Sequence, residues 1–229
     1  MKLFDLKNLG KLEEAKFIER PNRFVGLCDI NGDIKRCHIA DSGRLKEILT
    51  KGRELLVVKN PSGMKTDYKV VAAKMEDGWI LLNTSFHSKI GRKAIEKGVL
   101  GFIPKKIKSE VKFGSSRLDY LIDDKVFVEL KGSNLLVDGK CLFPDAPTSR
   151  GKRHVEELME AVEKGYEAII LFMLLRKCKC FEPNSRLDPD FADVFYKALK
   201  KGVEFVAFQV EIDNEFNINL KENISLCKR

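Results

Sequence analysis

The feature that most constrains the fold of this chain is a change of hydrophobic pattern near residue 84. Before it, short strand-like runs are separated by turn residues, and after it, helical periodicity alternates with strand-like runs. Short strands with frequent turns indicate a small β-barrel, whereas helices that alternate with strands indicate a sheet covered by helices. We therefore predict an all-β domain over residues 1–83 and an α/β domain over residues 84–229.

The first domain contains the strongest hairpin signal of the chain. Two apolar runs, Phe24 to Ile30 and Ile34 to Ile39, flank Asn31-Gly32, a dipeptide that accepts the positive φ angles of a tight hairpin turn. Five or so strands with one short helix fit an OB-like barrel, a fold that offers a face to oligonucleotides. An SH3-like barrel fits the same pattern almost as well. Further strands are expected at 55–58, 68–74 and 79–82, and the short helix at 44–49.

The second domain is expected to hold a mixed sheet with helices on its faces. Ala168 to Leu175 is apolar on both faces, which is typical of a strand in the middle of a covered sheet. Asp188-Pro189 is a helix N-cap followed by proline at the first helical position. Helices are expected at 88–97, at 152–164 and after Asp188, and strands at 107–113, 117–122, 126–131 and 203–210.

Two acids and a lysine form the most specific chemical pattern. If a hairpin turns on residues 123–125, counting back along both strands places Asp119 opposite Glu129, and alternation puts Lys131 on the same face. Opposed like charges are destabilising, so the pair predicts a bound Mg²⁺ or Mn²⁺, which prefer carboxylate oxygens. Lys131 would then activate water or stabilise charge on a phosphate. The alternative is a surface strand with a salt bridge between Glu129 and Lys131.

An Asp followed one hairpin later by Glu-x-Lys resembles the PD-(D/E)XK nucleases. Leu118 stands where these enzymes usually have proline before the Asp. The resemblance implies phosphodiester hydrolysis, with Asp119, Glu129 and Lys131 as catalytic residues and the two acids as metal ligands.

Positive charge is concentrated in the first half of the chain. Lys and Arg number 42 against 34 Asp and Glu, and residues 84–114 contain eight Lys or Arg and two Glu. Such a stripe can contact phosphates, although a solvated lysine-rich face has the same composition. Basic residues also cluster at the start of the 152–164 helix, where free N–H groups favour an anion; His154 would alternatively be hydrogen-bonded within the fold. The residues predicted to bind nucleic acid are Arg23, Arg36, Arg44, Lys46, Lys69, Arg117, Arg150, Lys152 and His154.

Several longer stretches match one known family. They are Glu110 to Gly114, Ser116 to Asp119, Val128 to Lys131 and, most specifically, Phe143 to Ala146 with the following Thr148, Arg150-Gly151, His154 and Glu157-Leu158. Over almost its whole length the sequence thereby resembles the sugar fermentation stimulation protein family, SfsA. The resemblance implies an OB-like domain, a PD-(D/E)XK-like domain and DNA binding. Many members have a Glu where this chain has Lys93, so Glu96, which follows at i+3, is a candidate substitute for a third acid.

Three functions remain open from the sequence. The first is a DNA-binding protein with a metal-dependent nuclease site, and the second is a non-enzymatic DNA-binding regulator of sugar metabolism genes. The third is an enzyme acting on a phosphorylated sugar, which would not bind long polynucleotides in a gel-shift assay. The expected partner is DNA, double- or single-stranded, or RNA.

No membrane partner is expected, and the protein is predicted to be cytoplasmic. The longest nearly unbroken apolar run has eight residues, against the roughly 20 that a membrane helix needs, and the N-terminus shows no secretory signal. The six cysteines have neither the spacing of a disulfide framework nor that of a zinc site. We therefore expect ordinary thiols, including Cys178 and Cys180.

Overall fold

A computed structural model describes residues 1–41 and 43–228 of the chain. The chain forms two compact units: Met1–Phe86 with Glu211–Asn219, and His87–Val210 with Leu220–Arg229. Among the described residues, no helix is long and apolar enough to span a bilayer.

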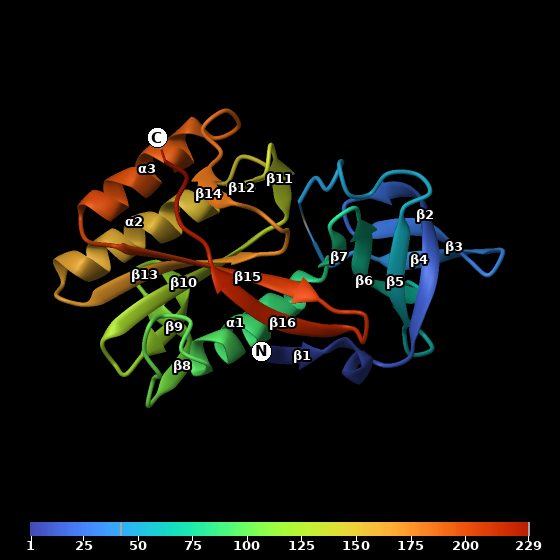
Figure 1. Cartoon of the computed structure of the whole chain (residues 1–229), viewed down its shortest axis with the longest axis horizontal. Helices are drawn as coiled ribbons and strands as arrows, with labels where there is room; N and C mark the ends of the chain where they lie inside the picture. The colour runs from blue at the N-terminus through green and yellow to red at the C-terminus, as the bar shows by residue number, and fades with distance from the viewer. Residues whose placement is uncertain (42, 229) are drawn as a thin grey trace. The chain divides into compact units, whose positions relative to one another are not determined.

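The first unit is built on a closed five-stranded barrel (Figure 1). Its strands are hydrogen-bonded in the order β4-β3-β2-β5-β6, and a parallel pairing between β4 and β6 closes the barrel. β7 extends from β6 as an antiparallel neighbour. The strands are β2 (Leu12–Asn22), β3 (Val25–Ile30), β4 (Asp33–His38), β5 (Glu54–Lys59), β6 (Tyr68–Met75) and β7 (Gly78–Leu81).

Local sequence explains the hairpin between β3 and β4. Asn31 and Gly32 have φ angles of 55° and 89°, as a tight hairpin turn between β3 and β4 requires. The inward side chains of the strands, among them Phe17, Cys28 and Val57, form the barrel core. The predicted hairpin is therefore confirmed.

Two parts of the first unit differ from the sequence expectation. Residues 46–48 form a turn instead of the expected helix over 44–49, and Leu45 has a φ of 52°, a left-handed conformation that a helix cannot contain. The region after Asn214, which carries no clear sequence signal, folds back as a strand. This strand, β16 (Asn217–Asn223), pairs antiparallel with β1 (Lys2–Asp5). Two short 3-10 helices complete the elements of this part of the chain, η1 (Leu6–Leu9) and η2 (Thr84–Phe86).

The second unit contains a mixed sheet in the order β15-β13-β10-β9-β8. The pairs β8–β9 and β9–β10 are antiparallel, and the pairs β10–β13 and β13–β15 are parallel. The central strand β13 is almost wholly buried, as its continuous apolar run predicts. The strands are β8 (Ile107–Phe113), β9 (Ser116–Ile122), β10 (Val126–Ser133), β13 (Glu167–Leu174) and β15 (Glu204–Ile212).

Helices cover this sheet. α1 approaches β10 so closely that a Cβ at Gly91 would lie 2.5 Å from Leu130 Cδ2. α2 and α3 lie side by side (Figure 1) and contribute to the main apolar core of the unit. Thr148 caps α2, and Asp188 caps α3 ahead of the predicted first-turn proline. The helices are α1 (His87–Glu96), α2 (Ser149–Glu163) and α3 (Pro189–Lys200).

A second, three-stranded sheet was not expected from the sequence. It consists of β11 (Leu135–Val137), β12 (Lys140–Phe143) and β14 (Cys180–Pro183). The chain beyond β16 joins it through a parallel bridge between Phe181 and Leu226.

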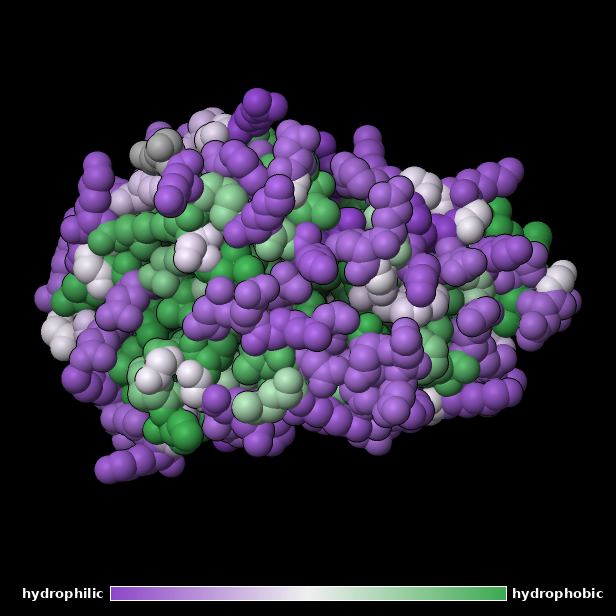
Figure 2. Space-filling view, in the orientation of Figure 1, coloured by the Kyte–Doolittle hydropathy of each residue, from purple (hydrophilic) through white to green (hydrophobic). Residues whose placement is uncertain are grey.

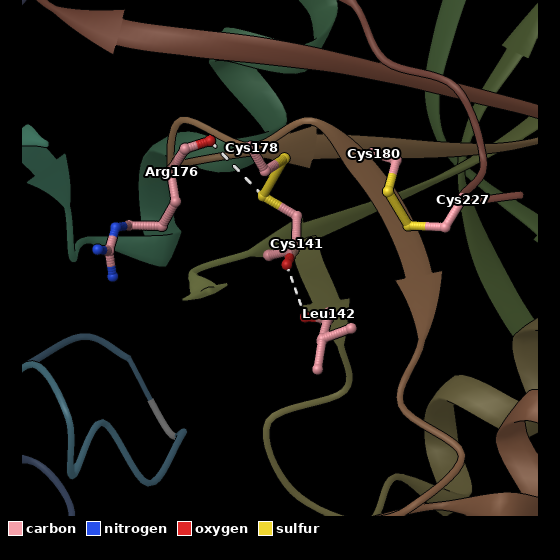
Figure 3. The surroundings of a disulfide bond; sticks show 7 residues. Cys141, Leu142, Arg176, Cys178, Cys180 and Cys227 are labelled. Atoms are coloured by element: carbon pink, nitrogen blue, oxygen red, sulfur yellow. Dashed lines mark hydrogen bonds between the residues drawn. A yellow bond between two sulfur atoms is a disulfide. The ribbon is translucent and has the colours of Figure 1, made fainter. Parts of the chain in front are cut away.

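Two disulfides fasten this small sheet and overturn the expectation of ordinary thiols. Cys141 of β12 is bonded to Cys178, and Cys180 of β14 is bonded to Cys227 (Figure 3). The expectation was wrong because the partners are 37 and 47 residues apart, and only the fold brings them together. Among the described residues, Cys28 and Cys37 are free and buried.

Candidate functional site

The register of the β9–β10 hairpin places the two predicted acids opposite each other. Ile122 pairs with Val126, and Tyr120 pairs with Val128, so the next residues in register are Asp119 and Glu129. This is the register predicted from the sequence. Each carboxylate also holds the neighbouring strand: Leu130 N–H donates to Asp119 Oδ2 over 2.7 Å, and Asp119 N–H donates to Glu129 Oε2 over 3.3 Å.

Glu129 lies at the centre of a cluster of polar side chains that also contains Lys131 and His154. It is 2% exposed, and its Oε1 lies 2.5 Å from Lys131 Nζ and in hydrogen-bond contact with His154 Nδ1. Burial opposes ionisation of this carboxyl, but the charge of Lys131 and the contact with His154 outweigh it and keep its pKa below the ordinary value. Glu129 is therefore held as a carboxylate.

His154 lies inside the site and not on the surface, where a phosphate contact was one expectation. It is 3% exposed on α2, and Arg150 Nε–H donates to its Nε2 over 3.4 Å. Because Nε2 accepts this bond and Nδ1 faces the Glu129 carboxylate, we assign the proton to Nδ1. The alternative expectation, a histidine hydrogen-bonded within the fold, describes these contacts, and His154 links Arg150 to Glu129.

Asp119 carries the clearest electrostatic perturbation of the site. Burial and the facing carboxylate of Glu129 raise its pKa to about 6, against an ordinary value of 3.8. The charge of Glu110 adds to this effect. The site thus holds two acids of different character, one firmly ionised and one that readily takes up a proton or a cation.

Glu110, an exposed residue of β8, is a further acid whose charge acts on Asp119, and the sequence reasoning missed it. In the β8–β9 hairpin, Val111 pairs with Leu118 and Ser109 pairs with Tyr120, which sets Glu110 opposite Asp119. Counting back from a turn at Gly114-Ser115 would have found it, by the same method that paired Asp119 with Glu129. Glu96, the acid considered instead, is held in ion pairs with Arg92 and Lys93 on α1.

The donor set suits a hard cation only in part. Across residues 1–41 and 43–228, no group of three or more His, Cys, Asp or Glu side chains is placed to hold a metal ion. Asp119 and Glu129 nonetheless offer carboxylate oxygens on one face, and Mg²⁺ is commonly held by one or two carboxylates with several waters. The two residues fit such a cation.

The other predicted binding residues are distributed over both units, and hydrophilic residues cover much of the face that Figure 2 shows. In the first unit Arg23, Arg36, Arg44 and Lys46 are exposed, while Lys69 is partly buried with its Nζ 5.6 Å from the centroid of the Phe86 ring. In the second unit Arg117 and Arg150 are exposed, and Lys152 pairs with Asp190 at 3.2 Å. The residues that the structure brings together are thus Asp119, Glu129, Lys131, Arg150 and His154.

We expect Asp119→Asn to stabilise the metal-free protein at neutral and higher pH. Between pH 3.8 and about 6 the folded state retains the proton of Asp119 longer than the unfolded chain, so stability falls as pH rises through this window. The shift corresponds to about 3 kcal/mol above pH 6. Asparagine keeps an oxygen for Leu130 N–H and removes the charge.

Urea unfolding in EDTA measures this effect. The free energy of unfolding should rise by up to about 3 kcal/mol at pH 8 and stay unchanged near pH 4. Asp193→Asn, at an exposed position of α3, is the matched control and should have little effect at either pH. Equal stability of wild type and Asp119→Asn at pH 8 would show that the buried carboxylate carries no such cost.

Comparison with known protein families finds one matching domain model in each half of the chain. Residues 18–82 match the SfsA N-terminal OB domain, and residues 85–216 match the sugar fermentation stimulation protein RE domain. The first match confirms the predicted OB domain over the SH3-like alternative.

Relatives that match most of the chain belong to the same family. A sugar fermentation stimulation protein homolog of Methanococcoides burtonii is 45% identical, with 83% of each chain covered, and one of Thermotoga petrophila is 38% identical, with 94% of this chain and 95% of the relative covered. Among solved structures, Pyrococcus furiosus SfsA in complex with Ca²⁺ matches with a TM-score of 0.90 and 32% identity over 100% of both chains. The chain therefore belongs to the sugar fermentation stimulation protein family.

Proposed function

We propose that this protein binds DNA and that its second unit is a PD-(D/E)XK-like domain with a divalent-metal-dependent nuclease site. The observation that carries this proposal is the set of two opposed carboxylates and one lysine on adjacent strands, Asp119, Glu129 and Lys131. A surface that only binds DNA has no need of buried acids, because they repel phosphate. A site that hydrolyses a phosphodiester needs them to hold a cation.

The proposed cofactor is Mg²⁺ or Mn²⁺ held by Asp119 and Glu129. The complex of the Pyrococcus furiosus relative with Ca²⁺ supports a hard-cation site in this family. The raised pKa of Asp119 is a further support, since the electrostatic strain it reports would be relieved by a bound cation. Such a cation supplies Lewis acidity at the phosphate and lowers the pKa of water bound to it.

The protein side chains have distinct parts in this proposal. Lys131 carries the positive charge that stabilises the developing negative charge on the phosphate. His154 and Arg150 fix the orientation of Glu129 from α2, through the contacts at Nδ1 and Nε2. His154 is a positioning residue in this scheme, so of the residues predicted to bind nucleic acid at the start of α2, Arg150 and Lys152 remain.

We expect Mn²⁺ binding to require both acids. Removing either carboxylate halves the protein ligands and leaves a weak site. Isothermal titration calorimetry on wild type, Asp119→Ala and Glu129→Ala is the measurement, with Glu96→Ala as a control because Glu96 is held in ion pairs on α1. Equal Mn²⁺ affinity in all four proteins would contradict a metal site at Asp119 and Glu129.

Binding to DNA should weaken steeply as salt rises. If the exposed cations neutralise about five phosphates, affinity falls by about 500-fold between 50 and 200 mM salt. Arg36→Ala should reduce the slope by about one, whereas Lys201→Ala, which removes a lysine paired with Glu163, should not. Fluorescence anisotropy with a labelled duplex measures the slope, and an affinity independent of salt would contradict phosphate contact.

One observation favours the second candidate, a non-enzymatic DNA-binding regulator. Glu129 Oε1 is already ion-paired with Lys131 and hydrogen-bonded to His154, so this acid is satisfied without any cation. In such a protein the nuclease-like fold would serve as a binding surface alone. The two candidates share DNA affinity and differ in cleavage.

A further inference from the structure

The loop between α1 and β8, residues 97–106, presents two large apolar side chains to solvent. Ile103 is 74% exposed and Phe102 is 39% exposed. The loop reaches this conformation through Gly98 and Gly101, whose φ angles of 82° and 89° favour glycine. Adjacent exposed apolar side chains of this size mark an interaction site more often than isolated ones do. We call Phe102 and Ile103 the apolar tip.

The backbone on both sides of the apolar tip is held by hydrogen bonds. Asp123 Oδ1 accepts the N–H groups of Lys105 and Lys106 over 2.9 and 2.7 Å, and Asp123 N–H donates to Lys106 O. On the other side, Asn223 Nδ2 donates to Val99 O over 3.3 Å, and Val99 is itself buried. The exposure of the tip is thus a property of a well-anchored loop.

Lysines surround the apolar tip. Residues 97–109 contain four lysines and no acid. Lys106 and Lys108 both pair with Asp124, whereas Lys97 and Lys105 are exposed and have no carboxylate partner among the described residues. An apolar projection with uncompensated positive charge at its base is complementary to a nucleic acid, in which stacked bases lie between rows of phosphates.

We propose that the apolar tip is a wedge that inserts into a base step of bound DNA while Lys97 and Lys105 contact the flanking phosphates. The inference rests on the proposed DNA binding and adds how the duplex is deformed. One or two apolar side chains suffice to unstack a base step, and the added contacts to the bent duplex offset the lost stacking. A membrane surface is less suited, because membrane-surface segments present a continuous apolar face.

The loop that carries the apolar tip is anchored next to a strand of the candidate catalytic site. Asp123, which accepts the N–H groups of Lys105 and Lys106, directly follows β9, the strand that carries Asp119. The proposed wedge and the candidate catalytic site thus belong to the same unit of the chain.

The experiment compares wild type, the Phe102→Ala/Ile103→Ala double variant and Val137→Ala. Val137 is 41% exposed on β11 and provides a matched apolar control. Duplexes carry 2-aminopurine at successive positions and a fluorophore pair at their ends, in EDTA to prevent cleavage. Thermal unfolding checks that all three proteins remain folded.

For wild type and Val137→Ala, binding should raise the 2-aminopurine fluorescence at one step and shorten the end-to-end distance. The double variant should lose both signals and bind at least about tenfold more weakly. Wild-type binding without either signal, or a double variant that behaves as wild type, would overturn the wedge and leave the proposed DNA binding intact. No DNA binding by wild type would overturn both. Loss of binding to anionic phospholipid vesicles, with DNA binding and bending retained, would assign the tip to a membrane and overturn the wedge.

Discussion

Lys131→Ala is expected to lower the rate of metal-dependent DNA cleavage by about a hundredfold or more. Its ammonium group lies 2.5 Å from Glu129 Oε1, on the face that carries both acids, and a charge there stabilises the transition state of phosphate attack. Lys131 belongs to neither apolar core, so Mn²⁺ and DNA binding should remain nearly intact. Single-turnover cleavage with Mn²⁺ measures the chemical step separately from binding.

A structural role of Lys131 makes a different prediction. If the lysine serves only as the counter-charge of Glu129, Lys131→Ala would lower thermal stability, and added metal would restore it. Lys140→Ala is the control, because Lys140 pairs with Glu182 at 2.8 Å in the small sheet. A variant that cleaves at the wild-type rate but unfolds at lower temperature would assign Lys131 to stability and not to catalysis.

Reduction of the two disulfides is expected to have the largest effect on stability. They close loops of 37 and 47 residues, and the loop-entropy relation gives about 4 kcal/mol for each bond. For a chain of this size, each bond then corresponds to a Tm change of about 10 °C. Thermal unfolding with and without a phosphine reductant measures the total.

Variants separate the two bonds. Cys227→Ser removes the bond to Cys180 near the end of the chain, where the side chain is partly exposed, so the smaller apolar loss leaves the disulfide as the main change. In this variant the reductant should lower Tm only by the contribution of the remaining Cys141–Cys178 disulfide. Six free thiols by mass spectrometry in protein purified without reductant, together with a Tm that reductant leaves unchanged, would contradict both bonds.

Local signals were sufficient wherever the structure depends on neighbours in sequence. Asn31-Gly32 specifies its turn through the φ angles it tolerates, and Asp188-Pro189 specifies a helix start through capping and a fixed φ. The pairing of Asp119 with Glu129 follows from the hairpin register, because a two-residue period leaves one consistent alignment.

Features that depend on distant contacts could not be predicted. The Cys141–Cys178 bond requires the small sheet, which itself forms from short strands far apart in sequence. The return of β16 to β1 joins the two ends of the chain, and nothing local marks it. Leu45 adopts a left-handed conformation in a segment with helical composition, because tertiary context overrides a weak propensity.

The candidate site also combines residues grouped by local sequence with a residue brought in by a distant contact. Asp119, Glu129 and Lys131 lie on one hairpin, so strand alternation alone groups them. His154 is separated from Glu129 by 25 residues and reaches it only because α2 packs on this face of the sheet. Its basic neighbours in sequence suggested a surface, yet its own position on the helix is buried.

A cleavage assay on purified protein tests the proposed nuclease site most directly. Wild type and Asp119→Asn, prepared identically, are incubated with duplex DNA, single-stranded DNA and RNA in Mg²⁺, Mn²⁺ or EDTA. We predict cleavage of DNA by wild type with Mn²⁺ or Mg²⁺, none in EDTA, and none by Asp119→Asn under any condition. Wild-type protein that binds DNA but leaves every substrate intact with both metals would contradict the nuclease site and leave the non-enzymatic regulator.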